Sequence, residues 1–109
     1  MREFMTNGVA DISGSFLQGS FRCSYKKLVD ILGLPNSESD EYEVSTEWVL
    51  CDKEKNVVAL YDWKETDLYS DDLPSVEEFR RRRSYDWHIG ARDKKTADAF
   101  IEWLKDKVK

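Results

Sequence analysis

The sequence predicts an α+β domain, in which an antiparallel sheet of about four strands has helices packed on one face. Two kinds of spacing lead to this prediction: apolar and polar residues alternate in several short segments, as in strands, while other segments have apolar residues at helical spacing. The length of 109 residues leaves room for only one hydrophobic core. The expected order of elements is β-α-β-β-(α)-β-α, with the helix in parentheses the shortest.

The beginning of the chain combines a loose segment with the first strand. Residues 1–14 are rich in Gly, Asn, Ser and Asp and show no period, so we expect a flexible lead-in to a single domain over residues 15–109. Residues 17–23 then alternate as a strand does. Gly19 lies inside this strand and indicates a bulge or a close approach of another part of the chain.

The first helix is predicted over residues 25–32. Ser24 is a suitable N-cap, Gly33 stands where a helix often ends, and Pro35 prevents continuation. The apolar residues of one helix face are Tyr25, Leu28, Val29 and Leu32. The start, the apolar stripe and the stop therefore agree on the same segment.

A pair of strands is predicted in the middle of the chain, over residues 44–51 and 57–63. A short charged turn joins them, which is typical of an antiparallel hairpin. Alternation places two sets of residues each on one face of their strand, namely Val44, Thr46, Trp48 and Leu50, and Val57, Ala59, Tyr61 and Trp63. The expected sheet rests on this alternation.

The last third of the chain is predicted to contain a short helix, a strand and a long helix. Ser75 and Glu78 form a capping-box signature for the short helix, which ends in the arginines at 80–83. Residues 85–90 alternate as a strand, and residues 93–108 have helical spacing. The apolar stripe of this last helix is made of Ala97, Phe100, Ile101, Leu104 and Val108.

The composition argues against several classes of protein. The apolar runs are too short for a membrane span or a signal peptide, so we expect a cytoplasmic location. Cys23 and Cys51 are expected to be buried, reduced thiols, because two cysteines and one histidine fall short of the four ligands of a zinc site. The scattered glycines form no phosphate-binding loop. We therefore expect neither a metal ion nor a cofactor.

The single histidine is the first residue to consider for catalysis. His88 alternates with Trp87 and Ile89, so it lies on the opposite strand face from them. A hydrolase needs a nucleophile with a base beside it, and no nucleophile signature accompanies this histidine. Paired carboxylates are plentiful, but in polar loops they are typical of a solvated surface. We expect no catalytic residues and a protein that acts by binding.

Charge is distributed unevenly along the chain, whose net charge is −5. Residues 1–79 carry 7 Lys or Arg against 17 Asp or Glu, whereas residues 80–109 carry 10 against 5. A dense carboxylate surface can occupy a basic site on another protein, although a merely solvated acidic face is the commoner explanation. The candidate protein-binding residues on the acidic surface are Asp40, Glu41, Asp67, Asp71 and Asp72.

The run of four arginines is the most unusual local feature. Consecutive helical residues spread around the helix, so all four cannot face one partner. One interpretation is an anion-binding patch with aromatic rings for stacking, made of Arg80, Arg81, Arg82, Arg83, Trp87, His88 and Arg92. The other is a charged surface that complements the acidic loops of the same protein. The net negative charge makes nucleic-acid binding the weakest alternative.

A set of motifs in a fixed order is similar to one known group of proteins. The motifs are Leu17-Gln18-Gly19, Cys23-Ser24-Tyr25 with Leu28-Val29, Gly33-Leu34-Pro35-Asn36, Glu47-Trp48-Val49-Leu50, Ala59-Leu60-Tyr61-Asp62-Trp63-Lys64 and Trp87-His88-Ile89-Gly90. Over residues 15–108 the chain resembles a family of short bacteriophage and prophage proteins, usually without an assigned function. The arginine run and the residues around 65–84 fall outside this pattern. The resemblance implies no catalytic residue.

The resemblance does imply a class of function. Small phage proteins commonly act by binding a host component, so the leading hypothesis is a stoichiometric antagonist of a host protein, such as a defence protein, in the host cytoplasm. The alternative is a module that sequesters a small anionic ligand, such as a nucleotide signal. Direct nucleic-acid binding is the third hypothesis, and no membrane partner is expected. The oligomeric state is not indicated.

Overall fold

The computed structural model describes residues 2–37 and 42–109. Within these residues, five strands form one open antiparallel sheet, in the order β1-β3-β4-β5-β2. The strands are β1 (Met5–Thr6), β2 (Phe16–Cys23), β3 (Glu47–Cys51), β4 (Val57–Tyr61) and β5 (Tyr85–Ala91). The helices within the described residues are α1 (Tyr25–Leu32), α2 (Val76–Arg80) and α3 (Lys94–Lys107). The predicted α+β class is confirmed, with one strand more than expected.

The additional strand lies in the segment predicted to be a flexible lead-in. β1 pairs with the end of β3, and the amide of Asn7 donates a hydrogen bond of 2.8 Å to the carbonyl oxygen of Val49. Phe4 is buried against Phe100 and Trp103 of α3, at ring-centroid distances of 5.2 and 5.8 Å. These first residues are therefore part of the domain. A strand of two residues is too short to show an alternation in the sequence.

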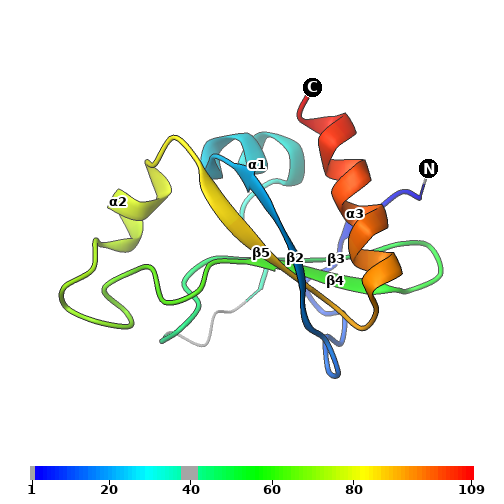
Figure 1. Ribbon diagram of the computed structural model, residues 1–109, viewed down its shortest axis with the longest axis horizontal. Helices are drawn as coiled ribbons and strands as arrows, with labels where there is room; N and C mark the ends of the chain where they lie inside the picture. Colours follow the sequence, from blue (N-terminus) through cyan, green and yellow to red (C-terminus); the bar gives the residue numbers. More distant parts are fainter. Residues whose placement is uncertain (1, 38–41) are drawn as a thin grey trace.

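The helices cover one face of the sheet, as predicted. In Figure 1, α1 and α3 both stand above the sheet, whereas α2 lies to one side, before the start of β5. The residues buried between these layers include Leu28, Trp48, Leu50, Val58, Leu60, Trp87, Ile89, Phe100 and Leu104. The rings of Trp48 and Trp87 meet edge-on at 5.5 Å in the middle of this core. The apolar stripes of the two longer helices therefore pack on the sheet.

The register of the β3–β4 hairpin decides which side chains enter this core. Trp48 of β3 pairs with Leu60 of β4, so both side chains point toward the helices. Val57, Ala59 and Tyr61 share a face of β4, as predicted, but it is the face turned away from Trp48 and from the helices. Both faces of β4 are apolar, so its alternation does not tell which face the helices cover.

Local signals set the ends of the helices. The hydroxyl of Ser24 caps α1, accepting an amide hydrogen bond of 3.0 Å, and Gly33 ends that helix with a φ of 83°, which glycine adopts without strain. The predicted capping box of α2 is present between Ser75 and Glu78. Asp93 caps α3. These residues act on their own neighbours in the chain, which is why the sequence predicts them well.

β2 is an edge strand of the sheet and contains the irregularity predicted at Gly19. Its register with β5 shifts between Leu17 and Gly19, which is a β-bulge. A Cβ atom on Gly19 would lie only 3.3 Å from Cδ1 of Ile101 in α3. The strand therefore has both features that the glycine indicated, a bulge and a close approach. The bulge lies beside Leu17, which lines a pocket on the face away from the helices.

Candidate functional site

The sheet face opposite to the helices is only partly covered by the chain itself. Residues 7–16 fold back at one end of this face, where Ile12 and Phe16 line a small hollow of about 200 Å³ together with Ala59. Beside that hollow the face stays open. We name the side chains that line the open part the outer strip, which consists of Leu17, Tyr61, Trp63 and His88.

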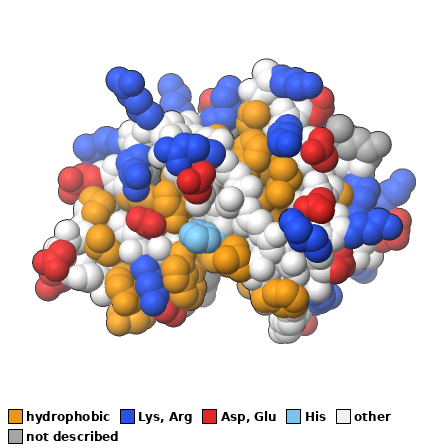
Figure 2. Space-filling model, in the orientation of Figure 1, with side chains coloured by type: hydrophobic (Ala, Val, Ile, Leu, Met, Phe, Trp, Pro, Cys, Tyr) orange, Lys and Arg blue, Asp and Glu red, His pale blue; other side chains and the backbone are white. Residues whose placement is uncertain are grey.

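The outer strip forms a shallow pocket of about 330 Å³. Tyr61 and His88 are paired residues of β4 and β5, and their rings stack at a centroid distance of 5.5 Å. The ring of Trp63 stands edge-on to Tyr61 at 6.5 Å. Leu17 and Trp63 are 57% and 41% exposed, and Figure 2 shows hydrophobic side chains on both sides of the pale blue histidine. The pocket can therefore receive an apolar group from another molecule.

A second aromatic pair continues this surface beyond the outer strip. The ammonium group of Lys64 lies 5.5 Å from the ring centre of Trp63 and 5.0 Å from that of Tyr69. The ring of Tyr69 in turn lies 5.2 Å from that of Tyr42, and Lys64 pairs with Glu43 at 3.6 Å. Figure 2 shows hydrophobic side chains gathered around a cationic one near the histidine. The lysine joins the two aromatic groups through cation–π contacts.

Buried hydrogen bonds hold the base of this surface in place. Asp62 is fully buried, and its Oδ1 atom accepts hydrogen bonds from the amides of residues 45–46, both at 2.8 Å. The hydroxyl of Tyr85 accepts a hydrogen bond of 3.3 Å from the amide of Trp63 and donates one of 3.2 Å to Glu65. The backbone on both sides of the exposed tryptophan is therefore fixed by polar groups that are themselves at least partly buried.

The two tyrosines near Trp63 stay protonated at neutral pH. Burial raises the pKa of Tyr85 well above its ordinary value, and the neighbouring carboxylate of Glu65 raises it further. Burial also raises the pKa of Tyr61, with a smaller contribution from Glu47. The hydroxyl of Tyr85 therefore keeps the proton that it donates to Glu65, and neither tyrosine acts as a phenolate base at neutral pH.

The four arginines at 80–83 do not form a common patch. Arg80 is used inside the protein, where its Nε atom donates to Oγ1 of Thr46 at 3.1 Å and its guanidinium lies 4.8 Å from an aromatic ring of α1. Arg81 and Arg82 form long ion pairs with carboxylates of this chain, at 3.7 and 4.0 Å. Arg83 is exposed. Three members of the run therefore engage different groups of the same protein.

The other residues of the predicted anion site also lie apart. Trp87 is 1% exposed in the core, and its ring nitrogen donates to a backbone carbonyl of β2 at 3.0 Å. His88 points to the opposite face, because successive strand residues face opposite sides. Arg92 follows the far end of β5, where it donates to the carbonyl oxygens of Ser13 and Asp11 at 2.9 and 2.7 Å. The structure does not bring this predicted set together.

Three of the predicted protein-binding carboxylates lie in the loop between β4 and α2. Asp67, Asp71 and Asp72 are exposed, and within the described residues none of them forms an ion pair. The amide of Asp67 donates a hydrogen bond of 2.8 Å to the carbonyl oxygen of Pro74, which closes the loop. The same loop carries Tyr69, so its carboxylates adjoin the apolar surface. Outside the described residues lie the other two candidates, Asp40 and Glu41.

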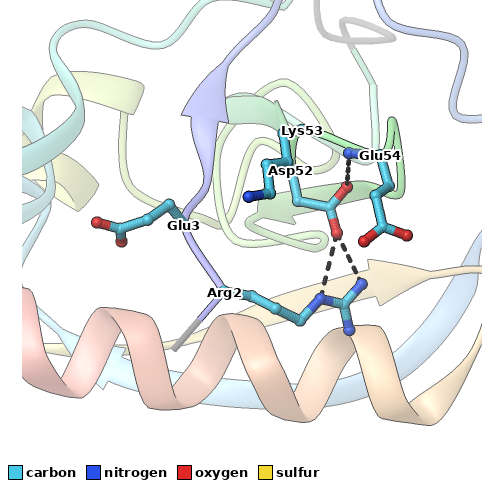
Figure 3. Close-up of a pocket in the computed structure, with 5 residues that line it drawn as sticks. All are labelled: Arg2, Glu3, Asp52, Lys53 and Glu54. Carbon is cyan, nitrogen blue, oxygen red and sulfur yellow. Dashed lines mark hydrogen bonds and ion pairs between the residues drawn. The ribbon is translucent and has the colours of Figure 1, made fainter.

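A further pocket, drawn in Figure 3, contains a structural ion pair. Arg2 and Asp52 approach to 2.7 Å, and the side chain of Asp52 is only 5% exposed. Figure 3 shows Arg2 and the amide of Glu54 directed at this carboxylate from different sides. Burial alone would raise the pKa of Asp52, but hydrogen bonds from Asn56 and Arg2 outweigh it and hold that pKa at about 2. This carboxylate holds the β3–β4 turn and the start of the chain together.

The cysteines and the remaining acidic groups suggest no reactive centre. Cys23 and Cys51 are both free thiols, the second buried and the first partly exposed. Burial raises the pKa of Cys23 to about 11, so its thiol is protonated and weakly nucleophilic at neutral pH. Among residues 2–37 and 42–109, no group of three or more His, Cys, Asp or Glu side chains is placed to hold a metal ion. None of the helices in these ranges has the length and apolar character needed to cross a membrane.

The sequence pattern missed most of the outer strip. Of its four members only His88 is among the candidate site residues predicted from the sequence, whereas Leu17, Tyr61 and Trp63 are predicted only as strand residues. The signal that could have found them is the second apolar face of β4, because a strand that is apolar on both faces needs a cover on each. Comparison of the chain with models of known protein families finds no match, and comparison with curated proteins finds none of significant similarity.

Proposed function

We propose that this protein acts by binding another protein through the outer strip, stoichiometrically and without catalysis. The observation that carries the proposal is the exposed pocket of the outer strip, on the sheet face opposite to α1 and α3. Rigid aromatic side chains beside an apolar pocket are typical of interface hot spots, because they bury a large area at a small cost in conformational entropy. An apolar side chain of the partner fills the pocket and packs against Trp63.

The charge near the outer strip suits a basic partner. Asp67, Asp71 and Asp72 are exposed in the loop that also carries Tyr69, and the whole chain has a net charge of −5. Carboxylates beside an apolar pocket attract a partner of opposite charge and speed its approach. We therefore expect a partner segment that carries Lys or Arg close to an apolar residue.

The resemblance to short bacteriophage and prophage proteins suggests what kind of partner this is. A phage protein that binds without chemistry acts on its host by occupying a site that the host protein needs. We therefore propose an antagonist of a host protein, for example a defence protein, that acts in the host cytoplasm. The fixed backbone around Trp63 supports this role, because a preorganised surface loses little entropy on binding.

Site-specific photo-crosslinking in host cells tests the proposal. A photoreactive amino acid in place of Trp63 should capture one partner in an equimolar complex. The same amino acid in place of Lys105, an exposed residue of α3, should not capture it. Capture of the same proteins from both positions, or of none from position 63, would contradict the proposal.

Two double variants then measure how much the outer strip contributes. Leu17→Ser with Trp63→Ala should weaken binding of the captured partner by about 2 kcal/mol, or about thirtyfold, as is typical of hot spots. The control removes two other exposed apolar side chains, Val9→Ser with Leu34→Ser, whose exposed fractions are 94% and 71%. The control should keep the affinity of the unmodified protein. Equal losses in both variants would show that the strip has no special part in binding.

The ligand-sequestering alternative gives a different result in the same preparation. A sequestered nucleotide copurifies as an ultraviolet-absorbing compound that heat releases, and it is retained when Leu17 and Trp63 are replaced. Loss of the protein partner from the double variant supports the proposed function, whether or not such a compound is present.

A further inference from the structure

A second open pocket lies on the same sheet face as the outer strip but at the opposite end, next to the β3–β4 turn. Its volume is about 760 Å³, within the range of small-molecule sites. Its lining includes Met5, Asp11, Lys53, Lys55, Val57 and Arg92. None of the four residues of the outer strip lines this pocket, so it is separate from the proposed protein-binding site.

The floor of this pocket is apolar. Cys51 and Val57 are paired residues of β3 and β4, and only 7% and 6% of their surfaces are exposed. Met5 of the edge strand β1 extends the floor and is 58% exposed. An apolar floor that is open on one side favours a ligand with a flat apolar body.

One wall of the pocket carries Asn7, Ala10 and Asp11, and an arginine holds this segment in place. Arg92 donates from Nε to the carbonyl oxygen of Ser13 at 2.9 Å and from Nη2 to that of Asp11 at 2.7 Å. Gly14 has a φ of 82°, which lets the loop turn at this point. The wall is therefore formed before any ligand arrives.

The opposite wall is the turn between β3 and β4. The carboxylate of Asp52 accepts hydrogen bonds of 2.9 Å from the amides of Glu54 and Asn56. This turn places Lys53 and Lys55 at the pocket, with Lys55 at a φ of 67°. The two lysine side chains are exposed, and within the described residues neither has an ion pair.

The balance of charge in this pocket is positive. Lys53, Lys55 and Arg92 carry three positive charges, and the arginine donates its hydrogen bonds to the neutral carbonyl groups of residues 13 and 11. The negative charge of Asp52 is matched by Arg2 at 2.7 Å. Asp11 is the remaining carboxylate of the lining. Its side-chain oxygen accepts a hydrogen bond of 2.9 Å from the amide of residue 13, and its negative charge interacts with Arg92. The protein itself does not neutralise the charges of the two lysines, so these charges are available to a ligand.

We propose that this pocket binds a small organic anion, namely a phosphate monoester with a flat apolar body, of the size of a nucleoside monophosphate. The phosphate group lies between Lys53, Lys55 and Arg92, and the flat body lies on Val57 and Met5. The arrangement departs from the anion site that the sequence predicted, of which it retains only Arg92. The inference is independent of the proposed protein-binding function, because the two pockets share no residue.

Titration of the isotope-labelled full chain, followed by nuclear magnetic resonance, tests the proposal with three probes. Adenosine 5′-monophosphate should shift the amide signals of residues 53–57 and 10–13. Inorganic phosphate and adenosine should each shift only some of these amide signals, and each should bind more weakly than adenosine 5′-monophosphate. Binding of adenosine as tight as that of its monophosphate would overturn the assignment of an anion, and the absence of shifts at residues 53–57 would overturn the site.

Matched charge reversals locate the phosphate group. Lys53→Glu with Lys55→Glu should weaken binding of adenosine 5′-monophosphate by about tenfold or more, because two attractive ion pairs become repulsive. Lys26→Glu with Lys27→Glu changes the same charge at exposed positions of α1 and should leave the affinity as it is. Equal losses in the two variants would show general electrostatic attraction and overturn the site. Trp63→Ala should not affect this titration, so failure here and failure of the protein-binding proposal remain distinguishable.

Discussion

The two faces of the sheet use tryptophan in opposite ways. Trp48 and Trp87, beneath the helices, are 0% and 1% exposed, and each ring nitrogen donates to a backbone carbonyl, at 2.9 and 3.0 Å. Trp63 on the outer face is 41% exposed and meets Tyr61 and Lys64 with its ring. A buried tryptophan contributes to folding stability, whereas an exposed one contributes its area only when a partner covers it. The covering elements, and not the residue type, therefore decide which aromatic residues belong to a binding surface.

The tryptophans of the two sheet faces should differ most in what they contribute to the stability of the fold. Trp87→Ala removes a buried ring and should lower the free energy of unfolding by about 3–5 kcal/mol, or prevent folding altogether. Trp63→Ala removes an exposed ring and should change it by less than about 1 kcal/mol. Unfolding in urea, followed by far-ultraviolet circular dichroism, measures both variants. Similar losses in the two would mean that the outer face is also part of the core.

The same contrast exists between carboxylates and predicts an intermediate effect. Asp52 is held by Arg2 and by the amides of the β3–β4 turn, whereas Asp71 is exposed. Asp52→Asn should lower the free energy of unfolding by about 2 kcal/mol at neutral pH, because a buried ion pair and charged hydrogen bonds are lost. Asp71→Asn should have little effect on it.

The pH dependence of this difference follows from the pKa of Asp52. Its value of about 2 in the folded protein lies below that of an unfolded aspartate, about 3.9. The stabilisation is therefore complete above about pH 4 and is lost as the pH falls toward 2. Urea unfolding across this range should show the unmodified protein approaching Asp52→Asn in stability. A constant difference between the two proteins down to pH 2 would contradict this role of the carboxylate.

The exposed carboxylates near the outer strip should influence how fast a protein partner approaches. Asp71→Asn with Asp72→Asn should slow association with the partner captured at position 63 by about two- to fivefold at low salt, and should weaken its salt dependence. The dissociation rate should stay unchanged, because these side chains lie in a loop beside the pocket. Surface plasmon resonance measures both rates, with Asp98→Asn and Asp106→Asn on α3 as the control. A change in dissociation alone would place the two carboxylates inside the interface.

Much of the secondary structure could be predicted because its signals are local. Ser24 and Gly33 bound α1 through contacts with their own neighbours, and the capping box from Ser75 to Glu78 starts α2 in the same way. Gly19 indicated a bulge because a missing side chain is visible in the sequence itself. The candidate site was less predictable. His88 was the only outer-strip residue among the candidates, since its neighbours in space come from other strands.

The fold class, the helix ends and the alternation of the longer strands β2 to β5 follow from the amino-acid sequence alone, because these depend on residues within a few positions of one another. Which apolar face of β4 the helices cover depends on long-range packing, since both faces of that strand are apolar. Long-range packing also determines which groups the charged side chains contact. Arg80 and Arg92 find partners at Thr46 and Ser13, which are remote in the chain, so no spacing rule could assign them. Sites made by long-range pairing appear only when the strands are in register.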